Sequence, residues 1–192
     1  KGAIYAGLTE LATAISERQW QRTDGGILSI EAPMVDSGWN TELVKRWCKQ
    51  HRRGWLPSKG HGLAAKDRML SEWYVHEGCR RGREWIESRP AKSPMKTVQF
   101  NANYWKTQMC SALCAPAGNR GSITLYAEHP THHLILATHL LSERATRVTA
   151  NGVTAIEWSL VPGSENHFLD CLVGCAVAAS RCGCVRPGDE QK

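Results

Sequence analysis

Segments typical of β-strands alternate with segments typical of α-helices along most of this chain, and this alternation restricts the fold more than any other feature. Short runs rich in β-branched and aromatic residues are followed by stretches in which apolar residues recur every three or four positions. A helix with an apolar stripe must bury that stripe against another layer. The pattern therefore predicts an α/β domain built on a mixed sheet with helices on both faces.

The individual elements can be placed by residue range. Helices are expected at 8–20, at 41–51 with Asn40 as N-cap, at 102–114, at 131–143, and at 164–180 with Ser164 as N-cap. Strands are expected at 27–35, 54–60, 95–101 and 122–126, and residues 1–7 read as the tail of a strand. Asn151-Gly152 predicts the turn of a hairpin. Residues 60–95 are rich in Arg, Lys and Gly and are expected to form an inserted, partly mobile segment. Its strand or packing residues are expected to be Trp73, Tyr74, Trp85 and Ile86.

The bulk properties indicate a single domain, expected at 1–181, followed by a disordered tail at 182–192. The 192 residues suffice for one core, and no apolar run approaches the roughly 18 residues that a membrane-spanning helix needs. A net charge of +6 favours an anionic partner, of which nucleic acid is the commonest. Because the chain opens on Lys1, we expect it to begin inside a longer protein.

The eight cysteines give little support for a zinc site. The sequence contains no Cys-x-x-Cys pair. Cys110 and Cys114 could be combined with the histidines at 129, 132, 133 and 139, but helical spacing explains the two cysteines more simply. Cys171 and Cys175 lie in an apolar helical pattern, where cysteine acts as a small hydrophobic residue. Reduced thiols in a cytosolic protein are therefore expected.

Two acids are candidates for chemistry. Asp36 follows an apolar run and precedes Ser-Gly, which alone is more typical of a turn than of a ligand. Asp170 lies in the last helix, opposite an apolar face made by Phe168, Cys171 and their neighbours at 172, 175 and 179. Its own side is also apolar apart from Asn166, so the helix is expected to be buried on both sides. A buried acid is paired, protonated or bound to metal, and a structural ion pair explains Asp170 about as well as a ligand role.

Considered together, the two acids suggest a divalent-cation site. Asp36 is expected at the carboxyl end of a strand, where open α/β sheets place their ligands, and the last helix could pack over that end. Mg²⁺ or Mn²⁺ takes oxygen ligands from separate elements, and two such ions can promote phosphodiester hydrolysis. Two carboxylates are too few for a two-metal site, so a third ligand is expected.

Basic residues are concentrated in the middle of the chain. Those at 45–53 could simply be a solvated helix end whose cations complement the helix dipole. The clustering beyond it suggests non-specific contacts with DNA phosphates. The candidate DNA-binding residues are Lys59, Lys66, Arg68, Arg80, Arg81 and Arg83.

Four segments in order give the chain a family resemblance: VDSGWNTELVKRWCKQH, GWLPSKG, FNANYWKTQMCSAL and WSLVPGSENHFLDCLVGCAVAA. Over roughly residues 8–180 it resembles the C-terminal nuclease domain of lambda-type (GpA-like) phage large terminase subunits. The resemblance implies a ribonuclease H-like fold and a metal-dependent endonuclease that cuts double-stranded concatemeric DNA during packaging. Asp36 matches the family's second acid and Asp170 its C-terminal acid. We expect both to bind Mg²⁺ or Mn²⁺ in a two-metal site, with Asn166 orienting Asp170 or a metal-bound water.

The resemblance also has implications for the completeness of the metal site and for the partners of the protein. No residue matches the family's first acid, so the sheet is expected to lack its first strands, and the chain alone to be inactive or weakly metal-binding. The implied partners are double-stranded DNA, the small terminase subunit, the portal and the protein's own ATPase domain, in the cytoplasm of a bacterial host.

Two alternatives remain open at the level of sequence. One is another ribonuclease H-like enzyme, such as a resolvase or transposase, which would act on branched DNA or transposon ends. The other is a non-catalytic DNA-binding or assembly module of a decayed prophage, which would bind DNA without cutting it.

Overall fold

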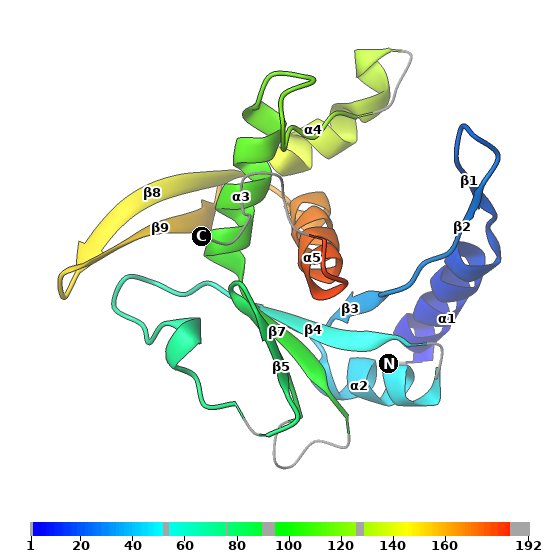
Figure 1. The fold of residues 1–192 in the computed structure, drawn as a ribbon, viewed down its shortest axis with the longest axis horizontal. Helices are drawn as coiled ribbons and strands as arrows, with labels where there is room; N and C mark the ends of the chain where they lie inside the picture. The colour runs from blue at the N-terminus through cyan, green and yellow to red at the C-terminus, as the bar shows by residue number, and fades with distance from the viewer. Residues whose placement is uncertain (1, 52–53, 76, 90–94, 126–128, 185–192) are drawn as a thin grey trace.

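A five-stranded mixed sheet forms the centre of the molecule (Figure 1). The computed structural model describes residues 2–51, 54–75, 77–89, 95–125 and 129–184. The strand order is β3-β4-β7-β6-β5. β3 (Met34–Asp36), β4 (Leu56–His61) and β7 (Thr97–Asn101) are parallel, whereas β6 (Trp85–Ser88) and β5 (Arg80–Gly82) are antiparallel additions. The mixed α/β prediction is confirmed, and the arrangement is consistent with a ribonuclease H-like fold.

Helices α3 (Ala102–Cys114) and α5 (His167–Arg181) cover one face of this sheet. Their shared core contains Trp85, Val98, Phe100, Trp105, Met109, Leu169, Val173 and Val177. Asn101 ends β7 and caps α3, since its side chain accepts a hydrogen bond from the Tyr104 amide. The strand and the helix are therefore joined without a loop, which fixes where α3 begins over the sheet.

Helices α1 (Gly2–Glu17) and α2 (Thr41–Gln50) form a second core on the opposite face. It is built from Ala12, Val44, Trp47 and Cys48. Asn40 caps α2 as predicted, its side chain accepting from the Leu43 amide. Figure 1 shows α1 and α2 on the side of the sheet away from α3 and α5. The prediction of helices on both faces is thus confirmed.

The remaining elements lie around this sandwich. A two-stranded hairpin of β8 (Glu143–Ala150) and β9 (Val153–Leu160) packs with its base on α3 and extends away from the sheet (Figure 1). η2 (Pro130–His133) runs into α4 (Leu134–Leu140), which contacts α5. A small ribbon of β1 (Trp20–Gln21) and β2 (Ile27–Leu28) follows α1. No helix in the described part of the chain is both long and apolar enough to span a bilayer.

Residues 60–95, expected as an insertion, supply two of the five strands. The chain leaves β4, passes η1 (Leu70–Glu72) and returns as β5 and β6 at the edge of the sheet. Arg81 holds this loop, donating to the carbonyls of Ser71 at 3.0 Å and Trp73 at 2.8 Å. Gly82 is required beside β6, because a Cβ atom there would lie 2.3 Å from the Trp85 ring.

Several other sequence predictions are wrong. Residues 2–7 extend α1 instead of forming a strand, because Tyr5 and Leu8 continue the stripe that packs on α2. Residues 122–125 form no strand, although the Ile123 amide bonds the Ala112 carbonyl. The 27–35 strand is divided into β2 and β3. The helix expected to reach 143 ends at Leu140, and Asn166, not Ser164, is the N-cap of α5.

The predicted boundary between the domain at 1–181 and the tail at 182–192 stays a prediction. Cys182 follows α5 as its C-cap, and residues 185–192 of the expected tail lie outside the described part of the chain.

Candidate functional site

Asp36 is the last residue of β3 and is exposed at the carboxyl end of that strand. Its Oδ1 accepts a hydrogen bond from the Gly38 amide at 3.2 Å. This is the turn role that the sequence suggested for Asp followed by Ser-Gly. Oδ1 is engaged in the turn, and the exposed carboxylate remains accessible to a further ligand.

Asp170 lies in the first turn of α5, and its side chain is 52% exposed. The prediction of a helix buried on both sides is wrong. Leu169, Val173 and Val177 form its buried stripe, whereas Phe168 is 43% exposed and Cys171 and Cys175 are exposed. The acid therefore lies at the boundary between the core and solvent.

The fold brings these two acids to the same face of the sheet. Asp36 pairs with Ser58 and Ser58 with Val98, whose side chain belongs to the core under α5. α5 in turn contacts β3. Partial burial raises the pKa of Asp170, Lys106 opposes this rise, and the negative charges of Glu143 and Asp36 add to it. The two carboxylates thus lie close enough to act on each other electrostatically.

Lys106 and Glu143, which the sequence did not indicate as site residues, form a charged cluster with Asp170. The ammonium of Lys106, from α3, lies 3.1 Å from Asp170 Oδ1 and 2.5 Å from Glu143 Oε1. Glu143 opens β8 and is buried, and its Oε2 has no hydrogen-bond partner. Since the residues lie on three elements far apart in the chain, no local spacing could have indicated them.

The sequence predicted that Asn166 would orient Asp170 or a metal-bound water, but the Asn166 side chain contacts Glu143 and not Asp170. Its Nδ2 donates to Glu143 Oε1 at 2.5 Å. Its backbone carbonyl accepts the Asp170 amide at 3.0 Å as the helix begins. Asn166 therefore links Glu143 to the start of α5. It is connected to Asp170 through the helix backbone and, by way of Glu143, through Lys106.

The donor set fits a hard divalent cation, but only as part of a site. Asp36 and Asp170 offer carboxylate oxygens from separate elements at a solvent-accessible edge, which suits Mg²⁺ or Mn²⁺. Within the described ranges, no group of three or more His, Cys, Asp or Glu side chains is arranged to hold a metal. The eight cysteines are free thiols, and Cys110 and Cys114 join no such group.

The candidate DNA-binding residues differ in their contacts, although the strand register places Lys59 and Arg81 on the same face of the sheet. Lys59 is exposed in β4 next to Ser58, so it projects to the face opposite Asp36. Lys66 is exposed in the following loop, and Arg68 is 3.6 Å from Glu72. The Arg83 guanidinium lies over the Tyr104 ring. Arg81 and Arg80 have structural contacts of their own, Arg81 within the loop described above.

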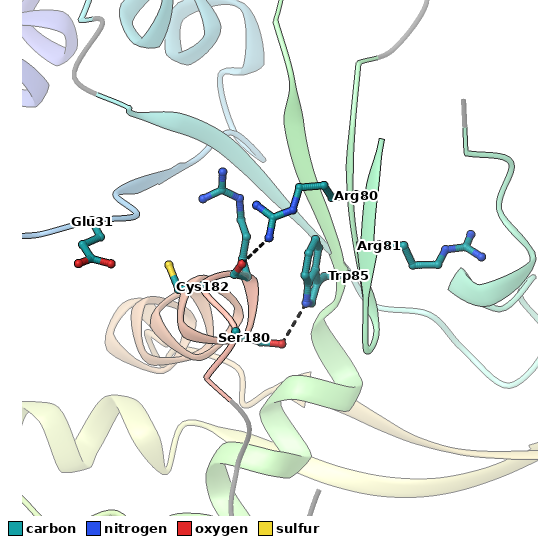
Figure 2. Close-up of a pocket in the computed structure, with 8 residues that line it drawn as sticks. Glu31, Arg80, Arg81, Trp85, Ser180 and Cys182 are labelled. Carbon is teal, nitrogen blue, oxygen red and sulfur yellow. Dashed lines mark hydrogen bonds between the residues drawn. The ribbon is translucent and has the colours of Figure 1, made fainter. Parts of the chain in front are cut away.

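Arg80 belongs to a pocket of about 510 Å³ at the C-terminal end of α5 (Figure 2). Arg80 Nη2 donates to the Arg181 carbonyl at 2.7 Å, and Trp85 Nε1 donates to Ser180 Oγ at 3.0 Å. Arg81 points away from these groups in Figure 2. Arg181 follows Asp170 by eleven positions in α5, which places the pocket roughly 16 Å along the helix from Asp170. The pocket residues make contacts at the C-terminal end of α5, whereas Asp170 lies in its first turn. The pocket is therefore separate from the acidic site.

Comparison with known proteins identifies one family. A family model described as terminase large subunit gpA, endonuclease domain, matches residues 5–187. No curated protein and no solved structure matches the chain.

Proposed function

The chain belongs to the family of terminase large-subunit endonuclease domains, and we propose that it cuts double-stranded concatemeric viral DNA with Mg²⁺ or Mn²⁺. The observation that carries this proposal is the convergence of Asp36, at the end of β3, with Asp170, at the start of α5. These are the two acids that the family resemblance assigns to the metal site, and the fold brings them to the same edge although 134 positions separate them.

In this proposal Asp36 and Asp170 hold the cation through carboxylate oxygens from a strand end and a helix start. A bound Mg²⁺ or Mn²⁺ would make water a better nucleophile at neutral pH and would stabilise charge on the leaving oxygen. A third oxygen ligand would complete the two-metal site. Glu143 and Lys106 set the electrostatic environment of Asp170.

The DNA would be held by contacts with its phosphates rather than with its bases. Lys59 and Lys66 are exposed, and cationic side chains of this kind bind the duplex backbone without reading sequence. Family membership also suggests the other partners: the small terminase subunit, the portal and the parent protein's ATPase domain, in the cytoplasm of the bacterial host.

The test combines metal binding with cleavage. Mn²⁺ binding to the chain is measured by calorimetry, and Mn²⁺-dependent nicking of plasmid DNA is measured with the terminase large subunit that carries this domain. Asp36→Asn and Asp170→Asn should each weaken Mn²⁺ binding by at least about tenfold, because each removes a charged ligand. Nicking should fall to background in both variants.

Asp24→Asn is a matched control. Asp24 Oδ1 accepts the Gly26 amide at 3.1 Å, in the same kind of turn as Asp36 with Gly38. Its substitution should leave Mn²⁺ binding and nicking unchanged. Variants at Asp36 and Asp170 that bind and cut as well as the parent would refute the assignment.

A further inference from the structure

Lys106 lies between two carboxylates that come from different elements. Its ammonium is 2.5 Å from Glu143 Oε1 and 3.1 Å from Asp170 Oδ1. The Lys106 side chain is 11% exposed and that of Glu143 is 2% exposed. Ion pairs in such shielded positions are screened by salt much less than surface pairs.

Glu143 anchors the ammonium from the protein side. Its Oε1 accepts hydrogen bonds from both Lys106 and Asn166, and its Oε2 is buried without a partner. If Lys106 moved away, this buried carboxylate would lose its counter-charge, which is strongly unfavourable. Lys106 is therefore a fixed positive charge beside Asp170 and not a mobile surface lysine.

The ammonium occupies only part of the Asp170 carboxylate. It contacts Oδ1 and leaves Oδ2 for another ligand. A cation bound by Asp170 and Asp36 would therefore lie within a few ångströms of a group that already carries a positive charge. Like charges at this separation repel measurably even in a water-like dielectric.

We propose that Lys106 is a positioning residue that acts as a resident counter-ion, holding Asp170 while the acids are metal-free and weakening their affinity for a divalent cation. This inference rests on the proposed function, since it assumes that Asp36 and Asp170 bind the cation. The consequence is a site that fills only at a higher cation concentration than its carboxylates alone would need.

Lys106 affects cation affinity in two opposite ways: it orders Asp170, which favours binding, and it repels the cation, which opposes binding. The larger effect decides whether removing Lys106 tightens or weakens binding. A unit charge and a divalent cation about 6 Å apart repel enough in water to change an affinity about tenfold. Ordering the short Asp170 side chain contributes less free energy to cation binding than the repulsion removes, because few rotatable bonds are restrained. Removal of the ammonium should therefore tighten metal binding, whereas loss of a merely structural contact would leave it equal or weaken it.

The experiment measures the affinity of the intact chain for Mn²⁺ alone, by calorimetry at fixed pH and salt. Lys106→Met should bind Mn²⁺ about tenfold more tightly than the parent chain. Because this variant leaves Glu143 without its counter-ion, the double variant Lys106→Met/Glu143→Gln is measured as well. It should also bind more tightly than the parent, but by less than Lys106→Met, because the loss of Glu143 removes a more distant negative charge that attracts the cation.

Lys96→Met is the matched control. Lys96 Nζ is 3.1 Å from Oε1 of the buried Glu87, which reproduces the distance between Lys106 and Asp170 away from the acids. Its affinity for Mn²⁺ should equal that of the parent. In spectra of ¹⁵N-labelled lysine, Mn²⁺ should broaden the ammonium signal of Lys106 well before that of Lys96.

The outcomes separate this inference from the proposed function. If Mn²⁺ binding depends on Asp36 and Asp170 but both Lys106 variants bind equally or more weakly, the inference is overturned and the proposed function stands. The same holds if Mn²⁺ leaves the Lys106 signal as sharp as that of Lys96. If Mn²⁺ binding is independent of Asp36 and Asp170, the proposed function fails and the inference fails with it.

Discussion

Glu87 keeps its charge inside the molecule because cations surround it. Its side chain is 3% exposed, and it lies 2.5 Å from Arg181 Nε, 3.1 Å from Lys96 Nζ and 3.9 Å from Arg80 Nη1. Burial raises the pKa of Glu87, but the hydrogen bonds and charges of Arg181 and Lys96 outweigh burial and hold it below its usual value. The ionised form is thus the one that the fold stabilises.

This predicts a defined pH dependence for Glu87→Gln. A carboxyl group with a lowered folded-state pKa stabilises the protein above its unfolded-state pKa of about 4.3, and this contribution is lost as pH falls through the folded value. At neutral pH the substitution leaves Arg181 without its partner and should cost about 3 kcal/mol. The difference from the parent should shrink on acidification below about pH 4.

Urea unfolding at a series of pH values measures this difference. Glu10→Gln, an exposed position on α1, serves as the control and should change stability little at any pH. A Glu87→Gln penalty that stays constant from neutral to acidic pH would show that the charge of Glu87 does not stabilise the fold.

Among individual residues, the sequence indicated those that stand out from their neighbours in the chain and did not indicate the others. Asp36 and Asp170 stood out because each acid interrupts an apolar run. Lys106 and Glu143 look like ordinary charged positions on a helix and at the start of a hairpin. Their importance arises only when α3, β8 and α5 meet, so it could not be read from spacing along the chain.

At the scale of elements, the β8–β9 hairpin is fixed by its two-residue turn. Asn151 and Gly152 have φ angles of 52° and 76°, as a type I′ turn requires. A Cβ added at Gly152 would meet no atom within 4 Å. A substitution there would therefore change stability only through the strain of a positive φ angle.

Gly152→Ala should therefore destabilise the hairpin by about 1 kcal/mol, because alanine disfavours a positive φ. Gly174→Ala in α5 is the matched control, since its Cβ would also meet nothing within 4 Å but its backbone is helical. That change should stabilise the protein by about 0.5 to 1 kcal/mol. Thermal unfolding and hydrogen exchange of the β8 and β9 amides would measure both, and effects of the same sign would contradict this account.

Elements were predictable where the pattern was long or the turn was specific. The range predicted for α3 matches Ala102–Cys114, and Asn151-Gly152 correctly located the hairpin turn. β5 was missed because it has only three residues, Arg-Arg-Gly, whereas Trp85 and Ile86 of the four-residue β6 were expected as strand or packing residues. Residues 122–126 have strand-like composition, but residues 122–125 pair with no strand in the described structure, so propensity alone was misleading.

At the scale of the whole molecule, one sheet supports two hydrophobic cores. Neighbouring residues of one strand face opposite cores. In β3, Met34 packs against the core that contains α5, and Val35 packs against the core that contains α2. Each core has a fully buried anchor, Leu169 on one face and Trp47 on the other. Loss of either core would expose one face of the shared strands, so the two cores are expected to unfold together.

Leu169→Ala should cost about 2–5 kcal/mol and Trp47→Ala about 3–5 kcal/mol, because both side chains are completely buried. Each variant should shift a single transition that is the same by circular dichroism and by tryptophan fluorescence, since a shared sheet couples both cores. Only Leu169→Ala should also weaken Mn²⁺ binding while the chain is still folded, because Leu169 seats the turn of α5 that carries Asp170. Separate transitions for the two faces would show that the site can lose its support while the α2 core remains intact.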